Sequence, residues 1–393
     1  MPPTERSLIS VVWLHIAFAA TGFGTTLLGC LLPALHSAWN LTDAQAGFLF
    51  ACQFTGAALG ALLVREDLFR SIQRGYFVMV VAAVALGSPH ASAAAAVFFL
   101  FGLGMGWAMT AINMLGGTVF EHPGAALSLL NASWIVGAAL SPEIATRWVR
   151  YAPPMRIYFV IALALAGIAM ILRHYRASLL GTNARRLQGG LGATPWLLIA
   201  GFSLVAFLYV GVEVSVSGWM MTFVHRLSIG TGFWAALITS SFWLALLCGR
   251  LLAPAVLLRV SESRLLLAAM FVACCSVISI LLNHSPVAIL LSAVAAGLAL
   301  APIFPLCASR VLALTHESPQ TKWLFSVAGM GGSLLPWLTG RLSTHTGSLR
   351  DGLLVPVVAL AIMIVCFSWI AGRRGLDLSP GVATVESESL AGN

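Results

Sequence analysis

The polar residues that could do chemistry in this chain lie inside long apolar stretches, and the clearest of them is Glu213. It stands in the middle of the segment FLYVGVEVSVSGWMMTF at 207–223, where a carboxylate at mid-membrane depth costs about 2.5 kcal/mol or more. Helical spacing puts Tyr209 and Ser217 on the same face as Glu213. We predict that Glu213 binds a coupling ion, either a proton or sodium. The alternative is an interhelical hydrogen-bond anchor with no functional role.

Amide and indole side chains form a second candidate group. Asn131 and Trp134 are three residues apart, so they share a helix face, and Asn113 lies in the preceding apolar stretch. Amides that donate and accept hydrogen bonds beside an aromatic plane suit a saccharide. The alternative is that the amides join helices and that the tryptophans pack. The predicted substrate-binding residues are Asn113, Asn131, Trp134, Tyr209, Trp219 and Gln53.

Other polar residues in the apolar stretches have local explanations. Glu143 and Arg147 are four residues apart, which predicts an ion pair on one helix. His15 could relay protons, or it could be a core histidine bonded to backbone or water. Pro302 removes a hydrogen bond inside a helix, which allows a hinge or an exposed carbonyl oxygen there.

Enzymatic chemistry has no basis in the sequence. We find no nucleophile–base pair, metal-ligand spacing or phosphate loop, and the seven cysteines lie in apolar segments without CxxC spacing. The glycines at 102, 104 and 106 lie within an apolar helix, which predicts close packing and not a nucleotide cradle. We therefore expect no catalytic residue, no metal site and no cofactor beyond the coupling proton or sodium.

The composition is that of an integral membrane protein. Hydrophobic residues make up 59% of the 393 positions and charged residues 9%, with a mean hydropathy of +0.94. A soluble protein of this size could not cover its surface with so few charges. The net charge of +8 therefore bears on membrane topology and not on nucleic-acid binding.

Twelve apolar spans of helical length can be placed along the chain. We predict them at roughly 8–35, 44–64, 75–90, 93–119, 124–147, 155–173, 195–224, 231–256, 263–283, 286–314, 319–343 and 351–371. The expected domains are an N-terminal six-helix bundle at 1–174, a cytoplasmic linker at 175–194, a C-terminal six-helix bundle at 195–372 and a disordered cytoplasmic tail at 373–393.

The two sets of spans look alike. The segment 41–63 and the segment 227–252 both have a polar turn, a Gly-Phe pair and then an apolar helix. The segments 129–142 and 324–336 both end in a proline near the helix end. Duplicated six-helix halves are typical of a transporter that rocks two bundles around a central site.

These features resemble the major facilitator superfamily, and more narrowly its fucose-permease-like branch of sugar:cation symporters. YVGVEVSVSGWMMTF is similar to that branch's seventh helix, GLALAPIFP to its tenth and LLNASWIVGAALSP to its fifth. The resemblance implies an all-α fold of twelve transmembrane helices in two pseudo-symmetric bundles. It also implies proton- or sodium-coupled import of a small polar solute, with a sugar favoured.

The resemblance also suggests where gating residues lie. The superfamily's loop between helices two and three usually carries an aspartate at the position of Val64, so that the usual contact is in doubt here and Glu66 or Asp67 could replace it. Arg250, after Gly249, matches the second-half copy of this signature. The predicted gating residues are Arg65, Arg250 and Pro302.

Two other functions stay open. A proton-coupled exporter of drugs or metabolites is the first alternative, although GAALSP in the fifth helix has only traces of the exporters' Gly/Pro-rich signature. A membrane receptor or scaffold without transport is the second. The expected partners are a small-molecule solute and the lipid bilayer, with no nucleic acid, and we expect a monomer.

Positive charge predicts the orientation. With the N-terminus inside, the inner segments carry 15 of the 21 Arg and Lys residues, which places both termini in the cytoplasm of a bacterial inner membrane. Reporter fusions after Arg186 and after Arg374 should therefore both report the cytoplasm, and a fusion after His90 the outside. Opposite locations for Arg186 and Arg374 would contradict six spans in the second half.

Overall fold

The computed structural model describes residues 3–88, 91–119, 123–175, 196–227, 232–314 and 322–372, and within these ranges the chain forms helices and no strand. The first half contains α1 (Pro3–Trp39), α2 (Asp43–Leu62), α3 (Leu68–Gly87), α4 (Ala94–Val119), α5 (Pro123–Trp148) and α6 (Ile157–His174). The second half contains α8 (Trp196–Arg226), α9 (Gly232–Leu257), α10 (Glu262–Leu282), α11 (Pro286–Leu300), α12 (Ile303–Leu314), α13 (Lys322–Thr346), α14 (Leu349–Gly352) and α15 (Leu354–Gly372). Short 3₁₀ helices at Ala91–Ala93 and Pro154–Arg156 precede α4 and α6.

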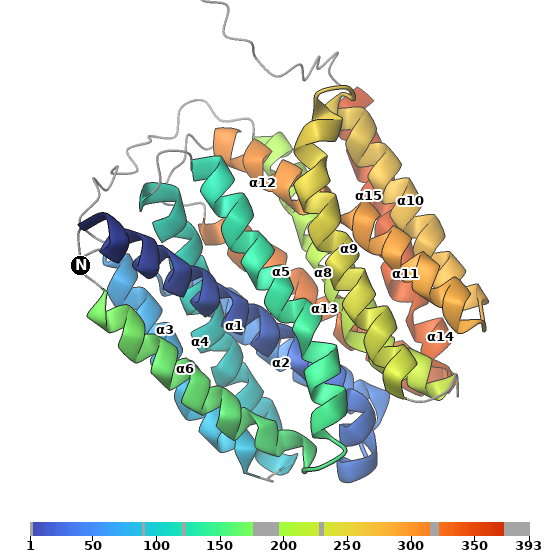
Figure 1. The fold of residues 1–393 in the computed structure, drawn as a ribbon. Coiled ribbons are helices and arrows are strands. Elements are labelled where there is room, and N and C mark those ends of the chain that lie inside the picture. Colours follow the sequence, from blue (N-terminus) through green and yellow to red (C-terminus); the bar gives the residue numbers. More distant parts are fainter. Residues whose placement is uncertain are drawn as a thin grey trace, which may run out of the picture.

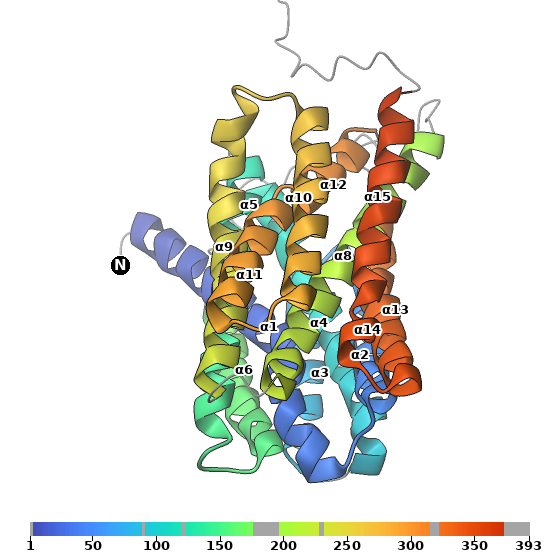
Figure 2. The ribbon, with the colours of Figure 1, turned by 90° about the vertical axis from the view of Figure 1, so that its right-hand side faces the viewer.

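The helices form two bundles with repeated internal packing (Figure 1). In the first half α1 packs on α5, α2 on α4 and α3 on α6, and in the second half α8 packs on α13, α9 on α11 and α10 on α15. The halves meet where α2 lies along α13, α5 along α9 and α1 against α8. In Figure 2 the helices α9, α10 and α15 run between the two ends of the molecule. The predicted architecture of two pseudo-symmetric bundles is confirmed.

Twelve segments of the described chain run from one end of the bundle to the other, because α11 and α12 together make one crossing and α14 and α15 another. In the described residues, ten helices are long and apolar enough to cross a membrane. Both α5 and α13 lie where the halves meet. At Pro302, where the sequence allows a hinge, the tenth span is interrupted between α11 and α12.

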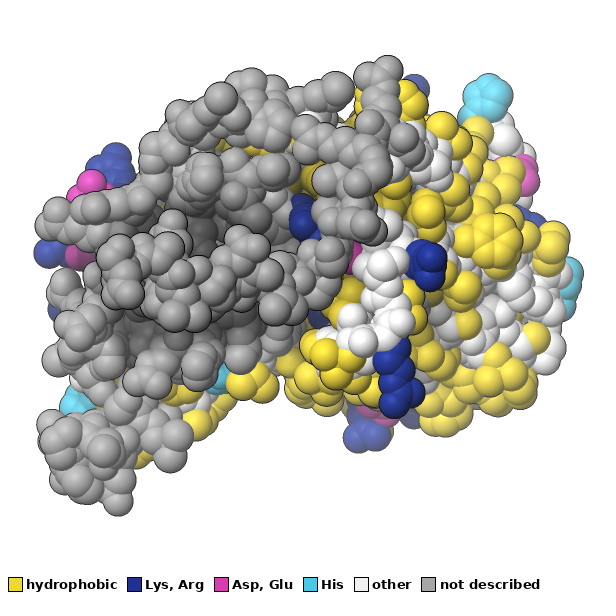
Figure 3. Space-filling model, turned by 90° about the horizontal axis from the view of Figure 1, so that it is seen from above, with side chains coloured by type: hydrophobic (Ala, Val, Ile, Leu, Met, Phe, Trp, Pro, Cys, Tyr) yellow, Lys and Arg dark blue, Asp and Glu magenta, His cyan; other side chains and the backbone are white. Residues whose placement is uncertain are grey.

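The outer wall of the bundle is apolar. Large hydrophobic side chains that no helix covers include Phe77, Leu163, Phe271 and Val365, each more than 60% exposed. In Figure 3, which views the molecule from the upper end of Figure 1, the described side chains are mostly hydrophobic and the charged ones occur in small separate groups. A soluble monomer rarely exposes so much contiguous apolar surface. These side chains face lipid, as expected for a multi-pass membrane protein.

Glycines bring α4 against its neighbours, as the sequence predicts. A Cβ atom added to Gly102 would lie 1.8 Å from the Gln53 carbonyl oxygen on α2, and one on Gly106 would lie 1.9 Å from the Ala57 carbonyl oxygen. Gly104, on another face, approaches the Gly75 carbonyl oxygen of α3 in the same way, at 2.6 Å. Only glycine permits this backbone approach, which packs α4 into the bundle.

Local sequence signals set the ends of two helices. Thr42 caps α2, where its side chain accepts from the Gln45 N–H while the Gln45 side chain accepts from the Thr42 N–H. This capping box satisfies two backbone donors that have no partner within the helix. Asp67 caps α3 by accepting from the Arg70 N–H at 2.9 Å. The candidate replacement for the superfamily's loop aspartate therefore starts α3.

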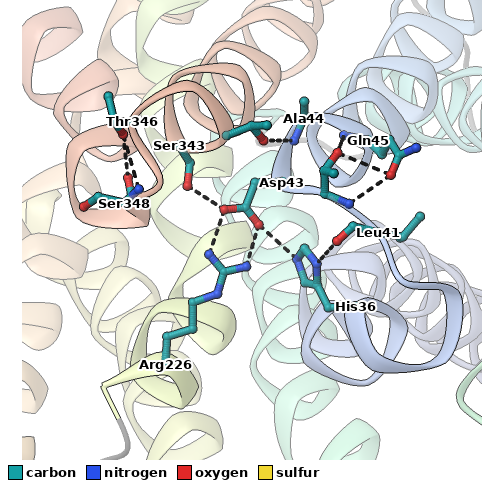
Figure 4. A network of polar contacts seen from close by, with 11 residues as sticks. His36, Leu41, Asp43, Ala44, Gln45, Arg226, Ser343, Thr346 and Ser348 are labelled. Carbon is teal, nitrogen blue, oxygen red and sulfur yellow. Dashed lines mark hydrogen bonds and ion pairs between the residues drawn. The ribbon is translucent and has the colours of Figure 1, made fainter.

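An ion-pair network joins the halves at the lower end of Figures 1 and 2, where α1 ends and α2 begins. We call His36, Asp43, Arg226 and Ser343 the clasp, and this end the clasp end (Figure 4). The Arg226 guanidinium on α8 donates two hydrogen bonds, of 2.6 and 2.7 Å, to the Asp43 carboxylate on α2. The Ser343 hydroxyl on α13 donates to the same carboxylate, and His36 Nε2 lies 3.3 Å from Asp43 Oδ1.

Further hydrogen bonds join α2 to α13, one beside the clasp and one farther along the two helices. The Ala44 N–H donates to the Thr344 hydroxyl at 2.8 Å, and the hydroxyls of Thr55 and Ser333 are hydrogen-bonded at 2.8 Å. Asp43 is buried while Arg226 is partly exposed. A bidentate pair with a buried carboxylate is stronger than a surface ion pair. The halves are therefore held together at the clasp end.

We expect Asp43→Asn to loosen the clasp end. The amide keeps the size of the carboxylate but loses the charge-assisted bonds to Arg226, a loss of about 1–3 kcal/mol. Double electron–electron resonance measures the distance between spin labels at Ser37 and His345, both exposed at this end. In Asp43→Asn the distance distribution should gain a second, longer component. Glu143→Gln is the control, because its partner Arg147 lies on the same helix. Identical distance distributions for Asp43→Asn and wild type would contradict a locking role.

Candidate functional site

A cavity lies between the two halves. It encloses about 1180 Å³ of space, its open side included, and is lined by residues of α1, α2, α4, α5, α8, α9, α12 and α13. Most of the lining is apolar, and aromatic side chains come from both halves, at Phe50, Phe54, Trp134, Trp243, Phe304 and Phe325. An apolar cavity with a few polar groups on its wall has the character of a small-molecule site.

The predicted polar face of α8 lies on the cavity wall. Tyr209, Glu213 and Ser217 all line the cavity, and each is less than 10% exposed. The Ser217 hydroxyl donates to the Glu213 carbonyl oxygen at 2.6 Å, which leaves the Glu213 carboxyl group free for other partners. The Tyr209 ring stacks on Phe304, another lining residue, with ring centroids 5.8 Å apart.

Arg250 faces the same cavity from α9. Its guanidinium and the Tyr209 hydroxyl are the groups that act electrostatically on the Glu213 carboxyl. The sequence predicts Arg250 as a gate at the end of its helix, whereas the structure puts it on the wall of the central cavity. This position makes it a candidate binding residue, and its gating role stays a prediction.

The predicted amide–indole face also lines the cavity. Asn113 on α4 and both Asn131 and Trp134 on α5 contribute to the wall. The Asn131 side-chain amide donates to Asn113 Oδ1 at 3.4 Å, so the amides also link α4 to α5. Trp134 meets Trp243 of the other half edge to face, with centroids 5.5 Å apart. The residues predicted as a group are thus brought together from different helices.

Gln53 and Trp219 are placed elsewhere. Gln53 is fully buried between α2 and α1, where its side chain donates to the Thr25 carbonyl oxygen at 3.0 Å. Trp219 is fully buried, and its indole N–H donates to the Pro336 carbonyl oxygen at 3.2 Å. Neither residue lines the cavity. Both side chains hold helices together, which is the alternative that sequence reasoning left open for such residues.

The other two predicted gating residues lie away from the cavity. Arg65 is exposed in the connection between α2 and α3, and its backbone N–H donates to the Ser71 hydroxyl at 3.3 Å. Pro302 is buried at the break between α11 and α12. This break stands directly before Phe304, a cavity residue that stacks on Tyr209.

The remaining polar candidates have local partners. His15 Nδ1 lies 2.7 Å from the Ser133 hydroxyl, which joins α1 to α5, and neither residue lines the cavity. Arg147 donates to Glu143 at 2.7 Å, so the predicted ion pair along α5 is confirmed. The seven cysteines are free, and in the part of the chain that was described no group of three or more His, Cys, Asp or Glu side chains could hold a metal ion.

Sequence reasoning missed Trp243 and the clasp. Trp243 lies seven residues before Arg250, a spacing of about two helical turns that would have put both on one face of α9. Asp43 belongs to the polar turn LTDAQ and Arg226 to the end of a long helix. Each reads as an ordinary helix-end charge, and nothing in the sequence pairs them.

The cavity combines an acid, a cationic side chain and uncharged hydrogen-bonding groups. Among the described lining residues, Glu213 is the one acid and Arg250 the one strong base. The amides of Asn113 and Asn131 and the indole of Trp134, from the first half, line the same cavity. Such a site at the plane where two bundles meet is the arrangement of a secondary transporter, because rocking of the bundles exposes the site to either side in turn.

The fold and sequence of this chain match known transporters. The family profile described as Major Facilitator Superfamily matches residues 14–322. A bacterial homologue of the human lysosomal transporter Spinster, solved in an inward-facing and occupied conformation, is 15% identical with a TM-score of 0.69, covering 92% of this chain and 96% of the other. The transporter FucP in its outward conformation is 16% identical with a TM-score of 0.60, covering 93% of this chain and 99% of the other.

Two curated relatives match over shorter lengths. Bypass of stop codon protein 6 of Saccharomyces cerevisiae is 22% identical over 62% of this chain, and NiaP of Bacillus subtilis, a candidate niacin/nicotinamide transporter, is 27% identical over 35% of it. The matches span 56% and 36% of those two proteins. With the family profile covering most of its length, this chain belongs to the Major Facilitator Superfamily and is a multi-pass membrane transporter.

Proposed function

We propose that this chain is a cation-coupled symporter that moves a small polar solute across the membrane by alternating access, with a proton or sodium as the coupling ion. The observation that carries the proposal is the position of Glu213. Its carboxyl group is buried on the wall of the cavity between the halves, with Tyr209 and Arg250 as neighbours. A buried intramembrane carboxyl group at a binding cavity is typical of ion-coupling sites.

The clasp gives this mechanism one of its two states. In the proposed cycle, the paired Asp43 and Arg226 close the cavity at the clasp end, and solute and cation exchange with the opposite side. Rocking of the bundles about the shared cavity would break the clasp and open the other route. In the proposed orientation, with both termini in the cytoplasm of a bacterial inner membrane, the clasp end faces outward.

A sugar is the first solute to test. The amides of Asn113 and Asn131 lie beside the Trp134 ring on the cavity wall, which suits the hydroxyls and the C–H face of a hexose. FucP has the same fold. The partial likeness to NiaP adds niacin, a pyridine carboxylate, as a second solute to assay. We further propose that the transporter works as a monomer in the bilayer.

Export is the competing direction. A proton-coupled exporter could use the same cavity and the same acid, and it would release solute at the side from which a symporter takes it up. Proteoliposomes with imposed proton or sodium gradients separate the two. A symporter moves the solute in the same direction as the cation that flows down its gradient, whereas an exporter moves the solute in the opposite direction. A receptor or scaffold would move no solute at all.

Glu213→Gln should abolish gradient-driven accumulation and leave solute exchange largely intact. Glutamine keeps the size and hydrogen bonding of the acid but cannot take up and release a proton. Glu213→Asp should retain partial coupling. The measurement is uptake into proteoliposomes with and without the cation gradient. Accumulation by Glu213→Gln equal to that of wild type would make Glu213 a structural anchor, and coupling would have to be sought at His15 or Glu143.

Asn131→Ala and Trp134→Ala should each weaken solute binding by about 1–3 kcal/mol, through unmatched polar groups and lost aromatic contact. Gln53→Ala and Trp219→Ala are comparison variants, because these residues lie off the cavity and should change stability more than affinity. Binding is measured by titration calorimetry on protein in detergent or nanodiscs. Unchanged affinity in both cavity variants would show that these residues only pack.

A further inference from the structure

The hydrogen-bonding groups of the cavity that lack a partner are nearly all donors. The indole N–H groups of Trp134 and Trp243 and the Nε–H of Arg250 have no hydrogen-bond acceptor among the described residues. Both tryptophans are more than 90% buried, and all three side chains line the cavity. Indole and guanidinium groups only donate. The partner they lack is therefore an acceptor.

The Tyr209 hydroxyl is also buried on the cavity wall without a hydrogen-bond partner in the described part of the chain, and it can either donate or accept. Other hydroxyl groups of the cavity do not change the excess of donors. Thr25 donates to the Thr21 carbonyl oxygen at 2.7 Å, and Thr239 donates to the Ala235 carbonyl oxygen at 2.8 Å. Ser217 is bonded to its own helix in the same way. These hydroxyls each have one partner already, whereas the N–H groups of the two tryptophans and of Arg250 Nε have none.

The charges of the cavity also favour a solute that brings an acceptor. Glu213 and Arg250 balance each other while Glu213 is ionised. When Glu213 takes up a coupling proton, one of the two coupling ions of the proposed function, Arg250 keeps a positive charge in an apolar cavity with no counter-charge among the described lining residues. An unpaired charge in such surroundings is strongly unfavourable. A negatively charged group on the solute would remove that imbalance.

From this we infer that the solute is a small organic acid whose carboxylate pairs with Arg250, while the indole N–H groups of Trp134 and Trp243 donate to oxygen acceptors farther along it. The inference rests on the proposed symport and narrows its solute from any small polar molecule to a carboxylate, such as a sugar acid or an aromatic acid. A sugar acid keeps the hydroxyls that suit the amides of Asn113 and Asn131.

Geometry and coupling both fit such a solute. Trp243 and Arg250 are seven residues apart on α9, so they share a face and their Cα atoms are separated by about 10 Å along it. This span suits a six-membered ring with a carboxylate at one end. Because the anion favours the protonated form of Glu213, solute and proton each raise the affinity of the site for the other. Neither is then carried well alone.

The test compares acids with neutral molecules of nearly the same shape. Binding of D-glucuronate against D-glucose, and of nicotinate against nicotinamide, is measured calorimetrically on the full chain in nanodiscs. In at least one pair the acid should bind tenfold or more tightly than its neutral partner, with uptake of about one proton per site. That proton uptake should be absent in Glu213→Gln.

Variants assign the preference to Arg250. Arg250→Gln should lose the preference for the acid, Arg250→Lys should keep part of it, and Trp243→Phe should weaken acid binding several-fold while preserving the ring contact. Arg147→Gln is the matched control, since it removes an arginine that pairs locally on α5. Size-exclusion profiles show which variants are folded. If Arg250→Gln misfolds, the loss of acid binding is measured on Arg250→Lys and Trp243→Phe instead.

The outcomes separate this inference from the proposed function. Equal or tighter binding of both neutral molecules, failure of both acids to bind, or an acid preference that survives in folded Arg250→Gln would overturn the inference. In each of those cases, gradient-driven accumulation of glucose would still support the proposed symport. If the acids bind but none of the four solutes accumulates along a cation gradient, the proposed symport is wrong. The inference that Arg250 binds a carboxylate would then still hold.

Discussion

Polar groups inside an apolar bundle have no bulk water to hydrogen-bond with, and this constraint decides where the polar side chains of this protein lie. Most satisfy themselves within or between helices: the Thr239 hydroxyl bonds to its own helix and Gln53 to the backbone of α1. The clasp collects charges at one end of the bundle. Of the buried polar atoms that have no partner among the described residues, those of Trp134, Tyr209, Trp243 and Arg250 line the central cavity, where one solute could bind several of them.

The two halves repeat each other in packing but not in chemistry. The pairs α1–α5 and α8–α13 are equivalent, as are α2–α4 and α9–α11. Yet Glu213 and Arg250 both belong to the second half, while the amides of Asn113 and Asn131 belong to the first. A solute bound between them would contact both bundles at once. The clasp also joins the two halves, but its acid lies on the first half and its arginine on the second.

Most of the fold could be predicted from the sequence, because each span is a continuous apolar run and the runs repeat. The face shared by Tyr209, Glu213 and Ser217 follows from helical spacing alone. The partners across the bundle do not follow. Trp219 lies two residues beyond Ser217 and faces α13 and not the cavity, and helical spacing cannot say which neighbour covers a given face of a helix that is buried on many sides.

Pairings across long sequence separations were also out of reach. Asp43 and Arg226 are 183 positions apart, and each has an ordinary place at a helix end. Arg250 was placed by its position beside Gly249, near the end of a span. A long side chain need not act at the level of its own Cα atom. The position of Arg250 in the sequence therefore predicts the helix that carries it, but not the cavity that its side chain lines.

One crossing, α13, falls outside the apolar helices of the described residues, and this has a consequence for how the protein is made. It is covered along one side by α2 of the opposite half. A second half released into the bilayer without the first would present this less apolar helix to lipid. We therefore expect a second half made alone, from a gene split between α6 and α8, to be less stable in the membrane than one made together with the first half.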